Sequence, residues 1–134
     1  MTTPPHQRTP ADTPSDVSEL PHLKVPIQPS DFAKIDIRVG RVVSASLNEK
    51  ARKPAYKLSI DFGPLGVLGS SAQITEHYSP ENLIGQLVVA VVNFPPKHVA
   101  GFRSEVLVLG ADHPTDGIIL LQPTKPIAPG TPVA

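Results

Sequence analysis

Two apolar runs joined by a short polar connection constrain the fold of this chain more than any other feature. Residues 87–92 are continuously apolar, as is typical of a buried strand. The segment that follows, NFPPKHVAGFRSEVLVLGA, begins with adjacent prolines that cannot donate backbone hydrogen bonds, so the sheet must open there. Gly101 then allows the chain to turn back into the second run, residues 105–109. We therefore expect a β scaffold that carries an exposed loop.

This loop combines basic and aromatic side chains. Lys97, His98 and Arg103 lie close in sequence to Phe94 and Phe102. Loops held by a rigid sheet are common binding sites, and such a mixture suits either a phosphate backbone or an unfolded peptide. The alternative is an ordinary connection, whose phenylalanines cover the core and whose cations are solvated.

Length and composition indicate a single globular domain. The 134 residues are 40% apolar but only 4% aromatic, without Trp, so the core must consist mainly of Val, Ile, Leu and Ala. The absence of Cys excludes disulfides, iron–sulfur clusters and thiolate zinc sites. The N-terminus has no apolar signal region, and no run approaches the roughly 18 apolar residues of a membrane span. We expect a cytoplasmic protein that does not insert into membranes.

The charges balance over the whole chain, with 12 basic and 12 acidic residues. No overall field would therefore draw the protein to nucleic acid, and any attraction must come from a local patch. One candidate patch contains six cations against the single acid Glu49: Arg38, Arg41, Lys50, Arg52, Lys53 and Lys57. Solvated strand edges and a charged loop are the alternative interpretation.

The chain divides into a central domain and two tails. Residues 1–29 contain seven of the 17 prolines and few apolar residues, which predicts a flexible extension, with at most a helical turn near residues 17–20. The domain spans residues 30–122 and begins with a turn capped by Ser30. In residues 123–134 the prolines recur every third position, which predicts an extended C-terminal arm.

Alternating apolar residues predict strands at residues 37–43, 56–62 and 67–74, in addition to the runs above and a sixth short strand at residues 117–122. Gly40 suggests a bulge or a sharp coil in the first strand. The third is rich in polar side chains (Ser70, Ser71 and Gln73), which we expect to face a pocket. Ser79, Pro80 and Gly85 bracket a short helix. Together these elements predict an all-β protein, a five-stranded OB-fold barrel with short helices and terminal extensions.

Nothing in the sequence indicates catalysis, a metal or a cofactor. The histidines at positions 6, 22, 77, 98 and 113 lack ligand spacing, and the serines near position 70 do not lie in a nucleophile elbow. Glycines 63, 66 and 69 lead into a strand rather than a helix, which is unsuited to a phosphate loop. We therefore interpret the chain as a binding protein and not an enzyme.

Five segments resemble one known family: DFAKIDIRVGRVV, YKLSIDFG, SSAQIT, LIGQLVVAVVNFPPKHVAGFRSEVLVLG and IILLQP. They are similar to the CsaA family of export-related chaperones, and the resemblance covers residues 31–133. CsaA proteins belong to a wider group of tRNA-binding OB domains, which are also found appended to methionyl- and phenylalanyl-tRNA synthetases.

The resemblance implies a homodimer formed through segments outside the barrel, with the C-terminal arm in the interface, and a groove on each subunit. The groove would hold unfolded or export-bound polypeptides without ATP, in contact with the export machinery. The residues expected to bind peptide are Ser71, Gln73, Asn93, Phe94, Lys97, Val99, Phe102 and Ser104.

The alternative function is recognition of tRNA shape. The chain keeps Asn93, Pro96, Gly101 and Ser104 of the synthetase-type loop, but has Glu105-Val106 where those relatives carry Gly-Met. An acid there would repel phosphate. The residues expected to bind RNA are Arg38, Lys50, Arg52, Lys53, Lys97 and Arg103. A third hypothesis is an accessory domain that docks to a synthetase or a translocase.

Overall fold

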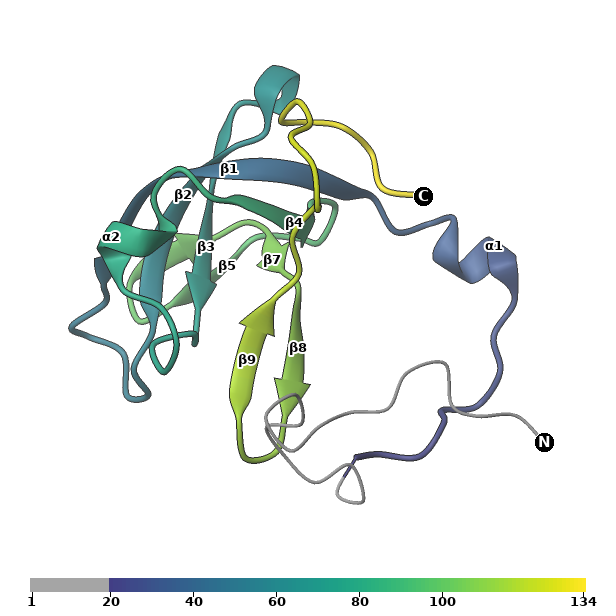
Figure 1. The fold of residues 1–134 in the computed structure, drawn as a ribbon, viewed down its shortest axis with the longest axis horizontal. Helices are drawn as coiled ribbons and strands as arrows, with labels where there is room; N and C mark the ends of the chain where they lie inside the picture. The colour runs from purple at the N-terminus through teal and green to yellow at the C-terminus, as the bar shows by residue number, and fades with distance from the viewer. Residues whose placement is uncertain (1–19) are drawn as a thin grey trace.

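A computed structural model describes residues 20–134 and contains nine strands and three short helical segments in this range (Figure 1). The strands are β1 (Ile37–Leu47), β2 (Tyr56–Asp61), β3 (Val67–Ala72), β4 (Leu87–Val91), β5 (Lys97–Val99), β6 (Phe102–Ser104), β7 (Leu107–Val108), β8 (Gly110–His113) and β9 (Gly117–Leu120). The helical segments are α1 (Pro29–Phe32), the 3-10 turn η2 (Gly63–Leu65) and α2 (Pro80–Leu83).

The main sheet is antiparallel, with the order β3-β2-β1-β4-β7. β1 pairs with β4 through its first half and with β2 through its second, and its register with β2 shifts between Val42 and Ser44. This irregularity bends the long strand, as barrel formation requires. Gly40 serves packing instead, because a Cβ there would lie 2.5 Å from Ile60 Cγ2 and 2.7 Å from the Phe62 ring.

The barrel closes where β3 meets the chain after β6. The Glu105 amide donates to the Gly69 carbonyl oxygen at 2.8 Å, and the Gly69 amide donates to the Glu105 carboxylate at 2.8 Å. The Ser71 amide donates to Ser104 Oγ at 3.0 Å. Side chains thus replace part of the backbone ladder. The expected five-stranded OB-type barrel is confirmed.

The core is mainly aliphatic, as the composition predicted. Its most buried large side chains are those of Phe62, Leu58, Ile60, Leu83 and Val42. Leu83 comes from α2, whose N-terminus Ser79 caps by accepting the Asn82 amide at 3.3 Å. The short helix predicted between the third and fourth strands is therefore present and places an apolar side chain in the barrel.

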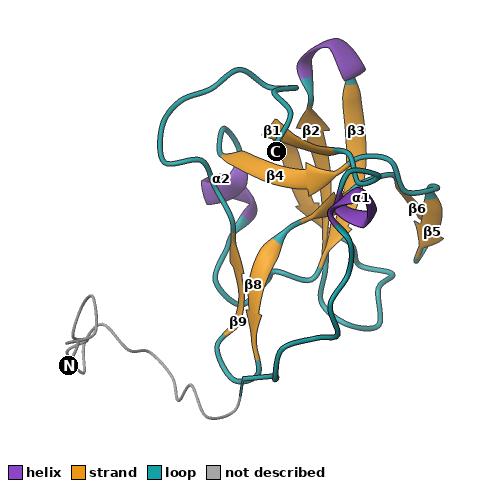
Figure 2. Cartoon of the chain, turned by 90° about the vertical axis from the view of Figure 1, so that its right-hand side faces the viewer, coloured by secondary structure: helices purple, strands orange, loops and turns teal. Residues whose placement is uncertain are grey.

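The segment after residue 104 differs from the expectation of one strand at residues 105–109. It is divided into β7, within the main sheet, and β8, which pairs with β9 in a separate hairpin (Figure 2). Gly110 permits this pairing, because a Cβ there would lie 2.5 Å from Ile118 Cγ2. The proline loop likewise contains a small hairpin, β5–β6, in which His98 pairs with Arg103.

Hydrogen bonds fix the β8–β9 hairpin to the rest of the molecule. Tyr56 donates its hydroxyl to the Tyr78 carbonyl oxygen at 2.6 Å, and the Tyr78 hydroxyl accepts the Leu120 amide at 2.9 Å. His77 Nε2 donates to the Asp116 carbonyl oxygen at the hairpin tip. The β8–β9 hairpin is therefore held in a fixed position beside the barrel.

The two ends of the described chain behave differently. The C-terminal segment pairs with the edge of β1 that β2 does not reach: Gly130 donates its amide to Val39, and the Val39 amide donates to Thr131. The segment before α1 leaves the barrel instead (Figure 1). Residues 1–19, which include most of the turn expected near residues 17–20, lie outside the described part of the chain. Within residues 20–134, no helix is long and apolar enough to cross a membrane.

Candidate binding groove

A groove of about 650 Å³ lies between the end of β3, the β5–β6 hairpin, β7 and the β8–β9 hairpin. Its lining is mostly apolar and includes Phe94 and Leu107, each of which is 49% exposed. The polar residues of the lining include Ser71, Gln73 and Lys97. The complete lining is Ser71, Ala72, Gln73, Ile74, Phe94, Pro95, Lys97, Val99, Ser104, Glu105, Val106, Leu107, Val108, Leu109, Gly110, Asp112 and Ile118.

Six of the eight residues predicted to bind peptide line this groove: Ser71, Gln73, Phe94, Lys97, Val99 and Ser104. The polar third strand therefore faces a pocket through Ser71 and Gln73, as expected. Ser70 is different, since its side chain is fully buried and its hydroxyl has no hydrogen-bond partner among residues 20–134.

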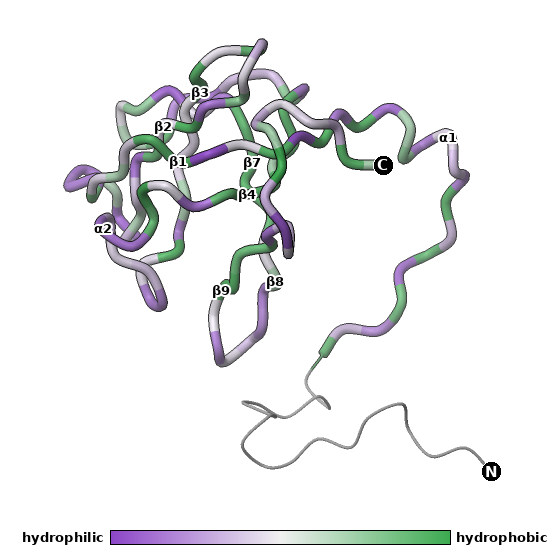
Figure 3. Tube along the Cα trace, turned by 45° about the horizontal axis from the view of Figure 1, so that its top comes forward, coloured by the Kyte–Doolittle hydropathy of each residue, from purple (hydrophilic) through white to green (hydrophobic). Residues whose placement is uncertain are grey.

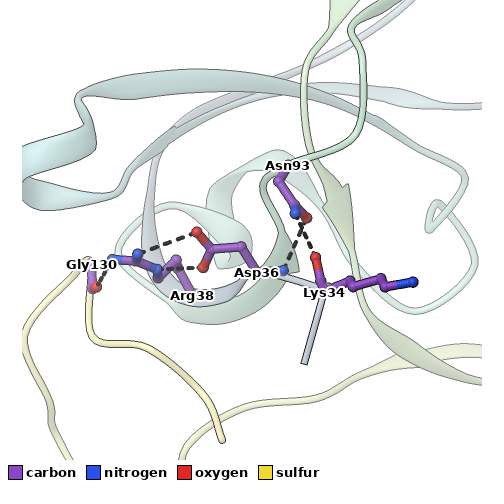
Figure 4. A network of polar contacts seen from close by, with 5 residues as sticks. All are labelled: Lys34, Asp36, Arg38, Asn93 and Gly130. Atoms are coloured by element: carbon purple, nitrogen blue, oxygen red, sulfur yellow. Dashed lines mark hydrogen bonds and ion pairs between the residues drawn. The ribbon is translucent and has the colours of Figure 1, made fainter. Parts of the chain in front are cut away.

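The other two predicted residues lie outside the lining. Asn93 accepts the Asp36 amide at 2.9 Å and donates to the Lys34 carbonyl oxygen at 2.8 Å, so its amide group joins the start of β1 to the end of β4 (Figure 4). Phe102 packs on β3, because a Cβ at Gly69 would lie 3.0 Å from Phe102 Cζ. Both residues support the walls of the groove.

The sequence alone did not indicate the apolar part of the groove that β7 and β9 supply. Leu107, Val108 and Ile118 line it, and these residues were interpreted only as strand positions. The available signal was the continuous apolar character of residues 106–109, soon after a polar, basic loop. Glu105 also lines the groove, with one oxygen on the Gly69 amide and the other 3.4 Å from Arg103 Nε.

Most of the predicted RNA-binding cations belong to two adjoining segments. Asn48 donates to the Val99 carbonyl oxygen at 3.4 Å, and a Cβ at Gly101 would lie 3.8 Å from Lys50 Cδ. The loop between β1 and β2 therefore lies against the β5–β6 hairpin that carries Lys97 and Arg103. Exposed Arg52 and Lys53 belong to the same loop.

Arg38 lies in a different environment. Its guanidinium donates to the Asp36 carboxylate at 2.6 Å and to the Gly130 carbonyl oxygen at 3.1 Å (Figure 4). The hydrogen bond to Asp36 raises the pKa of Arg38 above its ordinary value. Its contacts connect β1 to the C-terminal segment, so in the described structure Arg38 stabilises the fold through hydrogen bonds within the chain.

The chain is similar to proteins of known family and structure. The family model described as "Putative tRNA binding domain" matches residues 37–132. The structure of the CsaA chaperone from Bacillus anthracis str. Ames shares 52% sequence identity at a TM-score of 0.79, over 82% of this chain and 100% of that one. The chain belongs to the CsaA branch of this family. A CsaA chaperone from Picrophilus torridus also shares 52% identity, at a TM-score of 0.76, over 81% of this chain and 99% of that one.

Other relatives are much longer proteins. The methionine–tRNA ligase of Archaeoglobus fulgidus is 41% identical over 111 residues, which is 82% of this chain but 16% of the ligase. The 52% identity to two CsaA chaperones confirms the CsaA resemblance. The family is one of binding domains rather than catalytic ones. Among the described residues, no three His, Asp or Glu side chains are grouped to hold a metal ion.

Proposed function

We propose that this CsaA-family protein holds unfolded or export-bound polypeptides in its groove without ATP. The observation that carries the proposal is an open groove in which exposed Phe94 and Leu107 lie among polar side chains. Unfolded clients share exposed apolar side chains and free backbone groups but no sequence, and this lining matches both features. The 52% identity to CsaA chaperones supports the same function.

The proposed binding mode combines apolar contacts and polar contacts with the client polypeptide. Phe94, Leu107 and Val99 take apolar client side chains, each worth roughly 1.5–3 kcal/mol when fully buried. Ser71 and Gln73 exchange hydrogen bonds with the client backbone, and Lys97 attracts carbonyl or carboxylate oxygens. After the entropic cost of association, a few such anchors leave affinities of about micromolar, which suits reversible holding.

We further propose that the protein acts as a cytoplasmic homodimer that meets the export machinery. Exposed apolar side chains outside the groove support pairing, since Ile119 and Leu121 near β9 and Ile127 in the C-terminal segment are 44–47% exposed. Sedimentation at micromolar concentration is expected to give the mass of two chains. A monomer there would contradict the dimer.

The peptide hypothesis is tested by titrating a fluorescent, permanently unfolded peptide. Phe94→Ser is expected to weaken binding about tenfold, since it removes an apolar anchor worth more than about 1.4 kcal/mol. His98→Ser is the matched control, because His98 is exposed in the β5–β6 hairpin, four residues from Phe94, but does not line the groove. Equal affinities of wild type and Phe94→Ser would refute binding in this groove.

Recognition of tRNA is the second candidate, and one observation favours it. Lys50 lies beside the hairpin that carries Lys97 and Arg103, so loop and hairpin form one basic edge. Such an edge can track phosphates, as in other OB domains that bind nucleic acid. Replacing the loop cations is expected to weaken tRNA binding and to leave peptide binding in the groove unchanged.

A further inference from the structure

An exposed apolar segment precedes the domain and packs against little of its own chain. This N-terminal arm, defined here as residues 20–28, has the sequence LPHLKVPIQ. Leu23 is 98% exposed, Val25 83% and Ile27 67%. Figure 3 shows apolar and polar residues alternating along it. Three exposed apolar side chains in one short segment form an apolar patch of the kind that marks an interaction site.

The backbone of the arm favours one apolar face. Prolines at positions 21, 26 and 29 hold the residue before each of them in an extended conformation, and Gln28 has φ −86° and ψ 149°. In an extended chain, alternate side chains point to the same side. Paired as a β-strand, the arm would present Leu23, Val25 and Ile27 on one face and His22, Lys24 and Gln28 on the other.

Only the first residues of the arm lie outside the match to the B. anthracis CsaA structure. The B. anthracis CsaA structure is matched over its whole length by 82% of this chain, and the family model reaches residue 132. Nearly all of the unmatched 18% must therefore precede the domain, up to about residue 24. Residues 20–24 of the arm are therefore outside the matched length, and residues 25–28 are within it.

The arm is anchored at the edge of the groove. Asn93 holds Lys34 and Asp36, just after α1, and the next residue, Phe94, is part of the groove wall (Figure 4). From this anchor the chain leads out from the barrel to α1, and the arm then curves back below the molecule in this view (Figure 1). Its apolar face is therefore available to another molecule.

We propose that the arm binds as an extended strand in the groove of a second copy of this chain and competes there with client polypeptides. The inference rests on the proposed function, since the groove must accept polypeptide. The arm has the features expected of a client, namely alternating apolar side chains on an extended backbone. Its charges fit as well, because His22 and Lys24 are its titratable groups, whereas Glu105 and Asp112 outnumber Lys97 in the groove lining.

The expected consequence is a lowered apparent affinity for clients. A client meets only the fraction of grooves that the arm leaves open, so an arm bound nine-tenths of the time weakens client binding about tenfold. Locally crowded or high-affinity clients would still displace it.

Two triple variants of the full chain test this inference. The apolar-face variant combines Leu23→Ser, Val25→Ser and Ile27→Ser, and the control combines His22→Ser, Lys24→Ser and Gln28→Ser. All six positions are exposed, so neither set should disturb folding. The apolar-face variant is expected to bind an unfolded peptide about tenfold more tightly than wild type or the control. Equal affinity in all three proteins would overturn the proposal.

A labelled peptide of residues 20–30 identifies the binding site. It is expected to bind the apolar-face variant and to lose that binding when Phe94→Ser is added. Absent binding, or binding unaffected by Phe94→Ser, would show that the arm does not use the groove. Phe94-dependent binding of this peptide without any binding of unrelated unfolded peptides would instead refute the chaperone function and leave the arm contact intact.

Mixing distinguishes a second copy from the same chain. The single variant Phe94→Ser keeps its arm but has a defective groove, whereas the apolar-face variant has the reverse. An excess of the former, after subunit exchange, is expected to weaken client binding by the latter. Unchanged client binding in the mixture would refute the contact between copies.

Discussion

Two buried serines show how strongly the local environment decides what a hydroxyl contributes. Ser70 in β3 and Ser104 in β6 are both buried. Ser104 Oγ accepts the Ser71 amide at 3.0 Å, whereas Ser70 Oγ has no hydrogen-bond partner in the described part of the chain. A buried donor or acceptor that loses its partner destabilises a protein, while an unpartnered hydroxyl is itself unfavourable.

The two Ser→Ala substitutions should therefore have opposite results. Ser104→Ala is expected to lower the free energy of unfolding by about 1–3 kcal/mol, because it strands the Ser71 amide. Ser70→Ala is expected to leave it unchanged or to raise it by up to about 1 kcal/mol. Urea denaturation of both variants measures the difference. Comparable losses in the two would mean that Ser70 has a hydrogen-bond partner in solution.

Gly40 provides a second test at single-residue scale. A Cβ at this position would overlap Ile60 and Phe62, so Gly40→Ala is expected to destabilise the fold by about 1–3 kcal/mol through overpacking. Ser44→Ala, at an exposed position of the same strand, is the control and should change stability by less than about 0.5 kcal/mol. A stable Gly40→Ala protein would show that β1 can move away from β2 at no cost.

At the scale of elements, one carboxylate joins β3 to the chain after β6. Glu105 accepts the Gly69 amide, so Glu105→Ala is expected to lower the free energy of unfolding by about 1–3 kcal/mol. Glu105→Gln keeps an acceptor oxygen and should lose less than half as much. Thermal unfolding of the pair measures this contrast, and equal losses would indicate that the charge matters rather than the hydrogen bond.

Some of the strands were predictable from the sequence and others were not. β2 was predictable because its residues alternate strictly between buried and half-buried, and its apolar and polar residues alternate with the same period. The division of the chain after residue 104 into β7 and β8 was not predictable, since it depends on the close approach of Gly110 to Ile118. In the groove, the β3 and loop residues were predictable, but the structural use of the Asn93 amide depends on contacts about sixty positions away.

At the scale of the whole molecule, the formal net charge is zero, so any nucleic acid must be held by the local basic edge. The loop variant Lys50→Ala, Arg52→Ala and Lys53→Ala removes three of these cations. The charge-matched control replaces three exposed lysines outside the edge, namely Lys24→Ala, Lys34→Ala and Lys125→Ala. Comparing the two separates local contact from the loss of total charge.

Titration of unfractionated tRNA at two salt concentrations then measures how many phosphates the edge binds. If four cations contact phosphates, affinity should fall roughly a hundredfold between about 50 and 200 mM salt, because each contact releases counterions. The loop variant should bind more weakly at low salt with a flatter salt dependence, while the control should keep the wild-type slope. Equal slopes for both variants would place the contacts elsewhere. A wild type that shows no binding even at low salt would leave the groove, and its polypeptide ligands, as the functional surface of the molecule.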